Sequence, residues 1–239
     1  MTAFQKNDRI RKPVTCAYYD VSTLDDPALA TQHLRQLPWP ERQEQVMRYR
    51  FANDRRLCLG AGLLAADLLR KSGATDLTLG YGPHGKPYLL NHPTIHFNLS
   101  HSGSLAVCVV ADAPVGVDVE TIRSHGREVA GFCLQPVELA WLDRADDTAR
   151  AFTRLWVRKE SYIKLIGTGL SREPRTVCVL PDGPSERDAF FTEFEIGDSL
   201  VSVCMHDDRE VRLVRWSPPR PAAAPCTRAL RWTPSSQSN

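Results

Sequence analysis

Hydrophobic and polar residues recur along the chain with periods that predict helices and strands. Apolar residues that return every three to four positions predict amphipathic helices at 53–71, 135–144 and 148–166. Alternating or short β-branched runs predict strands at 15–21, 94–99, 105–110 and 115–120, with a second group inside 176–203. Between the strands at 94–99 and 105–110 we expect a polar turn from Ser100 to Gly103.

The predicted elements come in an order that is repeated once. A helix followed by strands occurs in both parts of the chain, and this recurrence indicates two similar halves that meet near 112–114, although the residues themselves show no recognisable repeat. Beyond 216 prolines and serines become frequent, as is typical of a disordered tail. We therefore expect an N-terminal half at 1–112, a C-terminal half at 113–216 and a tail at 217–239.

Two carboxylates share one face of the strand predicted at 115–120. Side chains alternate along a strand, so the valines point one way, whereas Gly116, Asp118 and Glu120 point the other way. Asp118 and Glu120 then lie roughly 7 Å apart, and their hard oxygen atoms suit Mg²⁺, with Gly116 leaving room beside them. The alternative is an edge strand whose polar face is solvated, which is the commoner situation for an isolated Asp-x-Glu.

The helix predicted at 148–166 carries charges that break its apolar pattern. Lys159 falls in the middle of the buried face, where an unpaired ammonium is costly, and such violations tend to mark functional sites. Glu160 and Lys164 flank the same face one turn apart. The alternative is an exposed Glu-Lys pair with a lysine that extends its ammonium to solvent.

Two other segments are weaker candidates for a functional site. Gly80 to Lys86 has the glycine and lysine spacing of a phosphate-binding loop, but Pro87 stands where such a loop needs the Ser or Thr that binds magnesium. Pro93 also interrupts any helix that could follow, so we expect no such loop. His101 is the most suggestive of the seven histidines because it lies in the polar turn, although a lone histidine is more often structural.

Composition excludes several classes of protein. A hydrophobic content of 42% in 239 residues is ordinary for a globular chain, and no apolar run of about 18 residues could span a membrane. A net charge of +2 is too small to indicate nucleic-acid binding. The seven cysteines are scattered singly, without the paired spacing of a zinc or redox site. We therefore expect a cytoplasmic protein with no nucleic-acid or membrane partner.

Four motifs together resemble a known family. They are Gly85-Lys86-Pro87, then Phe-Asn-Leu-Ser-His-Ser-Gly at 97–103, Gly-Val-Asp-Val-Glu at 116–120, and Trp-Val-Arg-Lys-Glu-Ser-Tyr-Ile-Lys at 156–164. In order and spacing they resemble the Sfp-type 4'-phosphopantetheinyl transferases. With the segment from Arg50 to Gly60, the resemblance covers most of the chain except its tail.

The resemblance implies both a fold and a reaction. The fold is α+β, with two similar α/β halves related by pseudo-twofold symmetry and the active site in the cleft between them. The reaction transfers 4'-phosphopantetheine from coenzyme A, the co-substrate, to a serine of an apo acyl or peptidyl carrier protein. Its products are holo-carrier protein and adenosine 3',5'-bisphosphate. Carrier proteins of this kind are acidic, and the resemblance implies a monomer with a pseudo-dimeric fold.

The matching motifs also imply roles for individual residues. Asp118, Glu120 and Glu160 would hold Mg²⁺, or Mn²⁺, on the diphosphate, and Glu160 would help to deprotonate the attacking serine. Lys164 would stabilise the leaving group. The implied coenzyme-binding residues are Arg56, Gly85, Lys86, Pro87, Ser100, His101, Lys159 and Lys164, with Lys86 and Pro87 at the adenine end.

Two other functions remain open from the residues. One is a different magnesium-dependent phosphoryl or nucleotidyl transferase that uses the same carboxylates, which the lack of a usable phosphate-binding loop disfavours. The other is a non-catalytic module that binds coenzyme A or a carrier protein. The joint presence of Asp118, Glu120, Glu160 and Lys164 argues against this loss of activity.

Overall fold

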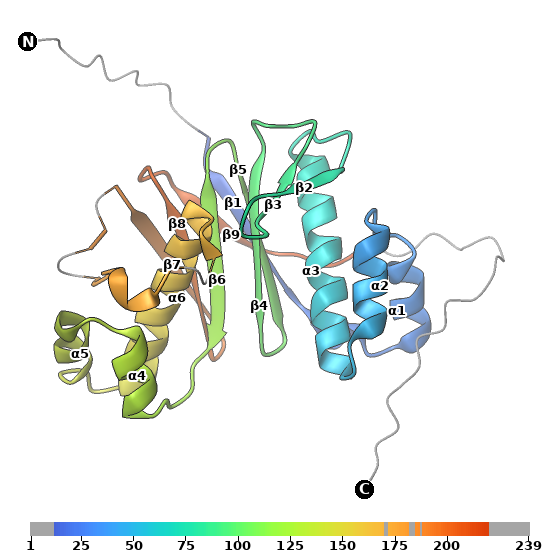
Figure 1. Ribbon diagram of the computed structural model, residues 1–239. Coiled ribbons are helices and arrows are strands. Elements are labelled where there is room, and N and C mark those ends of the chain that lie inside the picture. Colours follow the sequence, from blue (N-terminus) through green and yellow to red (C-terminus); the bar gives the residue numbers. More distant parts are fainter. Residues whose placement is uncertain (1–11, 170–171, 182–184, 187, 220–239) are drawn as a thin grey trace, which may run out of the picture.

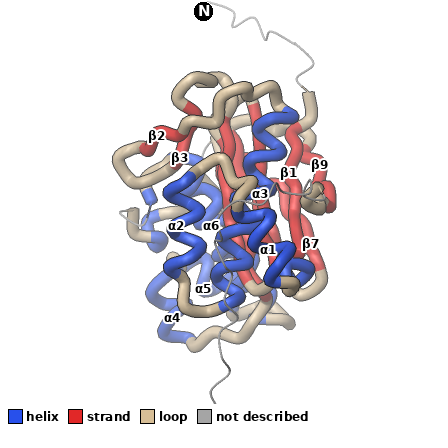
Figure 2. The backbone as a smooth tube through the Cα atoms, turned by 90° about the vertical axis from the view of Figure 1, so that its right-hand side faces the viewer, coloured by secondary structure: helices blue, strands red, loops and turns tan. Residues whose placement is uncertain are grey.

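The computed structural model describes residues 12–169, 172–181, 185–186 and 188–219. Its first half contains a four-stranded sheet in the order β4-β5-β1-β9 and a two-stranded hairpin of β2 and β3. The strands are β1 (Val14–Asp20), β2 (Leu79–Tyr81), β3 (Pro87–Leu89), β4 (His96–Ser102), β5 (Leu105–Ala111) and β9 (Val211–Arg215). The helices are the 3-10 turn η1 (Val21–Leu24), α1 (Pro27–Leu34), α2 (Pro40–Arg48) and α3 (Ala52–Lys71). Figure 2 shows the three α-helices in front of the strands.

The second half repeats the combination of helices on a sheet. Three strands pair in the order β6-β8-β7, namely β6 (Val115–Thr121), β7 (Phe190–Ile196) and β8 (Ser199–Met205). The helices are α4 (Arg127–Cys133), α5 (Pro136–Leu142), α6 (Thr148–Ile166) and the 3-10 turn η3 (Pro174–Thr176). Figure 1 places α1 to α3 on one side of the strands and α4 to α6 on the other.

Three hydrophobic cores hold these layers together. One core joins α3 to its own sheet, and a second joins α4, α5 and α6 to theirs. The third core lies between the two sheets and is rich in valine, including Val107, Val117 and Val203. Strands whose two faces are both covered need β-branched residues on both faces, which explains the nearly uninterrupted apolar run in β5.

Most predicted elements are found near their expected bounds, and the α+β class is confirmed. The helices predicted at 53–71 and 148–166 correspond to α3 and α6. The relation of the halves by pseudo-twofold symmetry stays a prediction. Within the described part of the chain, no helix combines the length and apolar character that crossing a membrane requires.

The end of the C-terminal half differs from the expected division. Strand β9 does not join its neighbours in sequence but pairs in parallel with β1, so residues 211–215 belong to the sheet of the first half. Trp216 follows it into the first core, where its ring meets Tyr19 edge-on at 5.2 Å. The expected tail lies outside the described residues from 220 onward.

The predicted polar turn is also corrected. Ser100, His101 and Ser102 belong to β4, and only Gly103 and Ser104 form the turn to β5, with Gly103 at a φ of 61°. This left-handed backbone is easy for glycine. The serines remain extended because both are buried with side-chain partners in β6.

Candidate active site

The candidate site lies where β4 and β6 run side by side, at the junction of the two halves. Side chains of β4, rather than a main-chain ladder, make the hydrogen bonds described between these strands. Asn98 accepts a bond from the Val117 backbone N–H at 2.9 Å. Ser100 donates to Asp118 and Ser102 donates to Glu120, each at 2.7 Å. This arrangement fixes the direction of both carboxylates of β6.

Helix α6 supplies the other charged groups of the site. Lys164 lies with its Nζ 2.6 Å from Asp118 Oδ1 and 2.9 Å from Ser100 Oγ. Glu160 lies one turn earlier in α6, close enough to Asp118 and Glu120 for their negative charges to raise its pKa. The structure therefore brings together the three carboxylates and the lysine that the sequence singled out.

The close approach of α6 to β6 depends on Gly116. A Cβ atom at this position would lie 2.0 Å from the Ser161 carbonyl oxygen and 2.4 Å from the Leu165 amide nitrogen. The expectation that Gly116 leaves room for an ion is thus corrected, because the helix backbone fills that space. Its effect is to bring Glu160 and Lys164 within reach of the strand.

The electrostatics of the site leave negative charge uncompensated. Burial raises the pKa of Glu160, and the neighbouring Asp118 and Glu120 raise it further against the opposing effect of Lys164. Asp118 Oδ2 and Glu160 Oε1 are both buried, and neither has a hydrogen-bond partner among the described residues. Buried carboxylate oxygens without donors are costly, and a hard divalent cation is the type of group that they suit.

The carboxylates are nevertheless not arranged as a finished metal site. Across the described ranges, no three His, Cys, Asp or Glu side chains are grouped so that they could hold an ion. The contacts of Asp118 with Lys164 and Ser100, and of Glu120 with Ser102, account for part of this arrangement. The donor chemistry fits Mg²⁺, and the ion itself stays a prediction.

Lys159 is placed differently from the expectation. Its side chain and that of Glu138 are both 0% exposed, and they form an ion pair at 2.6 Å inside the second half. The predicted contact of Lys159 with a coenzyme is therefore corrected to a buried ion pair. The break in the apolar pattern was a real signal, but its cause is an internal partner rather than a ligand.

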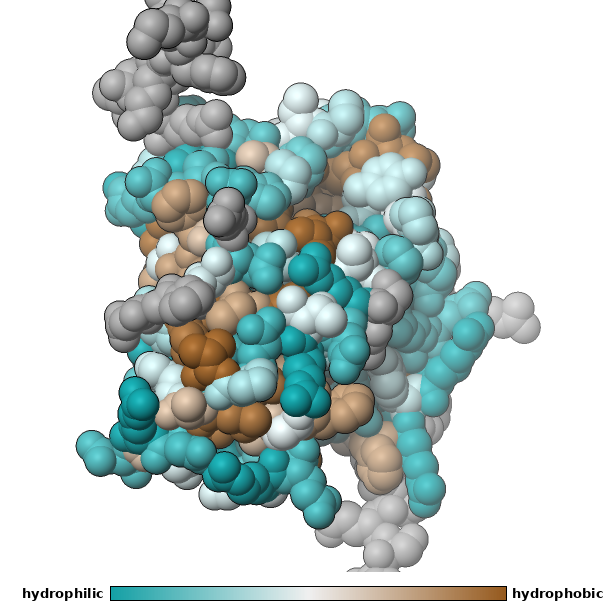
Figure 3. All heavy atoms as spheres, turned by 60° about the vertical axis from the view of Figure 1, so that its left-hand side comes forward, coloured by the Kyte–Doolittle hydropathy of each residue, from teal (hydrophilic) through white to brown (hydrophobic). Residues whose placement is uncertain are grey.

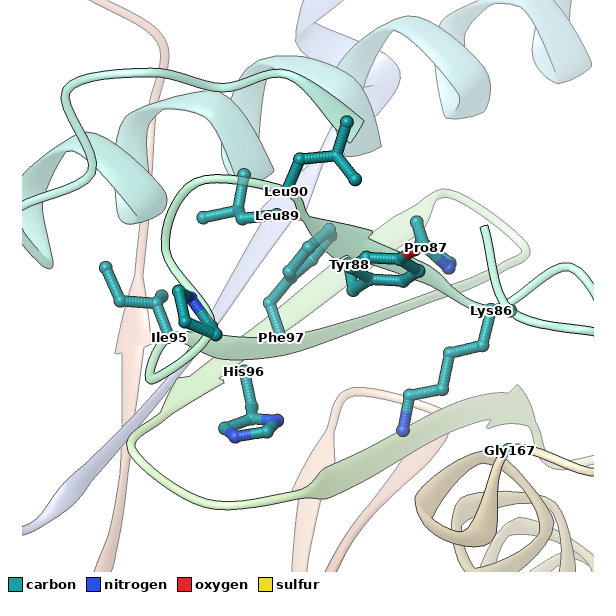
Figure 4. A pocket seen from close by; sticks show the side chains of 11 residues that line it. Lys86, Pro87, Tyr88, Leu89, Leu90, Ile95, His96, Phe97 and Gly167 are labelled. Carbon is teal, nitrogen blue, oxygen red and sulfur yellow. The ribbon is translucent and has the colours of Figure 1, made fainter. Parts of the chain in front are cut away.

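A cavity of about 410 Å³ lies beside the hairpin of β2 and β3 and is lined by Gly82, Lys86–Leu90, Pro93, Ile95–Phe97 and Gly167. Figure 4 shows Lys86 pointing past this cavity towards Gly167 at the end of α6. Its ammonium donates to the carbonyls of Val115 at 3.0 Å, Lys164 at 2.5 Å and Leu165 at 3.2 Å. Burial lowers the pKa of Lys86 to about 8.

Gly85 shapes the hairpin that carries this lysine. Its φ is 80°, and its N–H donates to the Gly82 carbonyl at 2.9 Å, which closes the turn between β2 and β3. The segment is therefore a β-hairpin and not a phosphate-binding loop before a helix. The absence of such a loop agrees with the expectation from the sequence. The coenzyme contacts predicted for Gly85, Lys86 and Pro87 stay predictions, and of these three residues Lys86 and Pro87 line the cavity.

Three basic residues of the first half bear on the predicted contacts with the coenzyme phosphates. His101 is exposed in part, and the partial burial of its ring lowers its pKa, which the cations of Arg42 and Lys164 lower further. Arg56 pairs with Asp25, while its buried Nε has no hydrogen-bond partner. Their predicted contacts with coenzyme phosphates remain predictions.

Three residues of the site escaped the sequence analysis. Ser102 and Asn98 connect β4 to β6, and Arg42 of α2 lies against α3, where its Nε donates to the Cys58 carbonyl at 3.1 Å. The alternation of Ser100 and Ser102 along a strand could have revealed the first. No local signal distinguishes Arg42 from other arginines of an exposed helix.

Comparisons with known proteins agree with the geometry. A family model described as "4'-phosphopantetheinyl transferase, N-terminal" matches residues 27–113, and one described as "4'-phosphopantetheinyl transferase superfamily" matches residues 114–214. A 4'-phosphopantetheinyl transferase of Bacillus subtilis is 33% identical over 136 residues, which are 55% of this chain and 61% of that protein. The 4'-phosphopantetheinyl transferase Sfp of Bacillus subtilis strain 168 is 32% identical, again over 55% of this chain and 61% of that protein.

A mammalian protein is also similar. The L-aminoadipate-semialdehyde dehydrogenase-phosphopantetheinyl transferase of Mus musculus is 26% identical over 200 residues, 66% of this chain and 63% of that protein. The matched regions thus span about three fifths of the length of these relatives. The two family models together extend through nearly all of the described fold. The chain belongs to the 4'-phosphopantetheinyl transferase superfamily and groups with its Sfp-type members.

Proposed function

We propose that this protein transfers the 4'-phosphopantetheine group of coenzyme A to a serine of an apo acyl or peptidyl carrier protein. The observation that carries the proposal is the grouping of Asp118, Glu120, Glu160 and Lys164 at the junction of the two halves, in a chain of this superfamily. The products would be holo-carrier protein and adenosine 3',5'-bisphosphate.

In the proposed reaction the serine oxygen forms a bond to the β-phosphorus of coenzyme A, and the bond from that phosphorus to the bridging oxygen breaks. Glu160 would accept the serine proton, directly or through water, a role that its raised pKa favours. Lys164 would neutralise the charge that develops on the leaving phosphate. Asp118, Glu120 and Glu160 are the residues that would hold Mg²⁺ or Mn²⁺, which when bound would neutralise the diphosphate.

Coenzyme A would lie along the first half. His101, Arg42 and Arg56 offer positive or proton-donating groups for its phosphates, and Ser100 would complete this set. The cavity beside the hairpin, with Pro87 and Phe97 in its walls, suits a flat aromatic base at the adenine end. This division leaves the carboxylates of β6 and α6 for the diphosphate.

The carrier protein would approach from the second half. A cavity of about 220 Å³ opens beside Glu120 and is also lined by Arg123 and Val129. Phe132, in the same helix as Val129, is 69% exposed, and Val129 is 46% exposed. Figure 3, turned so that the side of the second half comes forward, shows brown hydrophobic surface between teal hydrophilic residues. An exposed apolar surface next to an arginine suits an acidic partner that also offers apolar side chains.

Mass spectrometry tests the proposed transfer. Purified protein is mixed with coenzyme A, Mg²⁺ and several apo acyl and peptidyl carrier proteins, and we expect at least one carrier to gain the mass of a single phosphopantetheinyl group. No gain on any carrier would refute the proposal. If coenzyme A still raised the melting temperature, the protein would be a binding module, whereas stabilisation by ATP alone would indicate a different transferase.

A further inference from the structure

Lys159 and Glu138 form a buried ion pair that none of the proposed chemical steps uses. Both side chains are fully buried, and the pair connects the middle of α6 to α5. We propose that Lys159 is a positioning residue, whose ion pair with Glu138 sets the rotation of α6 about its axis and so directs Glu160 and Lys164 towards Asp118. The inference rests on the proposed function only where its test measures catalysis.

The polar groups around the pair are saturated. Besides Glu138, the Lys159 ammonium donates to the backbone carbonyls of Pro174, at 3.2 Å, and Val177. A lysine ammonium has three N–H groups, so each has an acceptor. The Glu138 carboxylate in turn accepts the backbone N–H groups of Gln135 at 2.8 Å and Val179 at 2.9 Å. Such a network permits one arrangement of α5, α6 and the segment 174–179 and leaves little freedom to slide.

The network lies on a different face of α6 from the one that meets the carboxylates of β6. Successive residues of a helix are about 100° apart, so Lys159 faces α5 while Glu160 faces the strand. On the strand side, the absence of a side chain at Gly116 lets the helix backbone approach closely. The helix is therefore held from two sides, by close packing against β6 and by a charged anchor in the second core.

Energetics separate positioning from simple stabilisation. An apolar pair of similar volume often stabilises a core as well as a buried ion pair does, whereas removal of one partner leaves an uncompensated charge. Hydrogen bonds are directional and apolar contacts are not, so an apolar pair should hold the rotation of α6 less tightly than the ion pair and its hydrogen bonds do. An apolar replacement of both residues should therefore keep the fold but loosen the aim of Glu160 and Lys164.

The decisive variant replaces both partners, Glu138→Leu with Lys159→Met. We expect a lower melting temperature, because the backbone groups that now bind Glu138 and Lys159 lose these partners, together with a KM for coenzyme A within about twofold and a kcat per folded molecule reduced at least about tenfold. The single change Lys159→Met should lower the melting temperature strongly. A double variant that kept the natural kcat would overturn the proposal, since a purely structural pair would leave turnover per folded molecule unchanged.

A second variant covers the case in which the double change does not fold. Glu138→Gln keeps the shape and one acceptor oxygen but removes the charge, and we expect lower kcat with unchanged KM for coenzyme A. The control is Arg150→Gln with Glu195→Gln, a pair that joins the start of α6 to β7 and in which each side chain is about half exposed. Natural turnover in the control and in Glu138→Gln alike would also refute the proposal.

A structural readout is independent of the proposed reaction. In a crystal structure of the double variant, or of Glu138→Gln if the double variant does not fold, we expect the contact of Lys164 Nζ with Asp118 Oδ1, 2.6 Å in the natural protein, to be lost or lengthened. Retention of this contact would contradict the proposal. If the natural protein modified no carrier, the proposed function would fail, while this measurement would still decide the role of Lys159.

Discussion

Glu160 combines unfavourable burial of its carboxylate with its proposed role in catalysis. Its carboxylate is desolvated, close to two others, and has one buried oxygen without a donor. Groups with such perturbed titration cluster at functional sites because catalysis needs them, although internal ion pairs produce them as well. The buried Lys159 belongs to the second kind, whereas Glu160, whose pKa stays raised despite the nearby Lys164, is the candidate for the first.

Replacement of Glu160 by Gln should therefore separate binding from turnover. The neutral amide can neither accept the serine proton nor balance the charge of a metal ion, so we expect kcat to fall by about 10²-fold or more. In the proposed reaction coenzyme A is bound mainly by the first half, so its Kd in calorimetry should stay within about threefold. Glu173→Gln, at an exposed carboxylate, is the control. Near-natural turnover in Glu160→Gln would contradict the assignment.

Lys86 gives a pH-dependent prediction at the same scale. Its folded pKa is about 8, whereas a lysine in the unfolded chain has a pKa of about 10.4. Between these values the unfolded chain binds more protons, so this residue makes stability rise with pH. We expect the free energy of unfolding of the natural protein, minus that of Lys86→Met, to increase by about 2 kcal/mol from about pH 7 to about pH 9.5. Urea unfolding at each pH measures it, and a constant difference would refute it.

At the scale of elements, the contact between α6 and β6 determines the geometry of the site. The sequence predicted α6 well because its apolar period is strong over 19 residues, and it predicted the facing carboxylates of β6 because strands alternate. It missed the extension of β4 through Ser102, because serines and a histidine usually indicate a turn. The partners that keep them extended come from another strand, which local patterns do not contain.

The close packing of α6 against β6 predicts that a side chain at position 116 lowers the stability of the protein strongly. Gly116→Ala places a methyl group on the backbone of Ser161 and Leu165, so we expect α6 to be displaced and stability to fall by about 1–3 kcal/mol or more. Gly131→Ala in α4 has no atom within 4 Å of the new carbon and should stabilise by about 0.5–1 kcal/mol. Chemical denaturation of both variants measures the contrast, and equal stabilities would contradict it.

At the scale of the whole molecule, the chain returns to its first half after building the second. Strand β9 adds to the edge of β1, and Trp216 donates from its indole N–H to Asp67 of α3 at 2.6 Å. The two sheets also share the valine-rich core between them. These connections couple the halves, so a site made from both can keep a constant geometry.

The substitution Trp216→Ala should show how much the return of the chain to the first half contributes to stability. The side chain is 7% exposed, contacts Tyr19 and fills the first core, so its loss should cost about 3–5 kcal/mol of stability. For a chain of this size each kcal/mol corresponds to about 2–4 °C in melting temperature. Differential scanning calorimetry measures the shift. A change below about 2 °C would show that the end of the chain contributes little.

The sequence by itself determined the α+β class and the main helices and strands, and it singled out Asp118, Glu120, Glu160 and Lys164 as candidate site residues, because periodicity and short motifs are local properties. Only the tertiary structure decided that Lys159 pairs with Glu138, that Lys86 binds three backbone carbonyls, and that β9 joins the first sheet. Each of these depends on groups distant in the chain. Their approach is set by how the cores pack, and no local pattern encodes which distant partner a buried charge will meet.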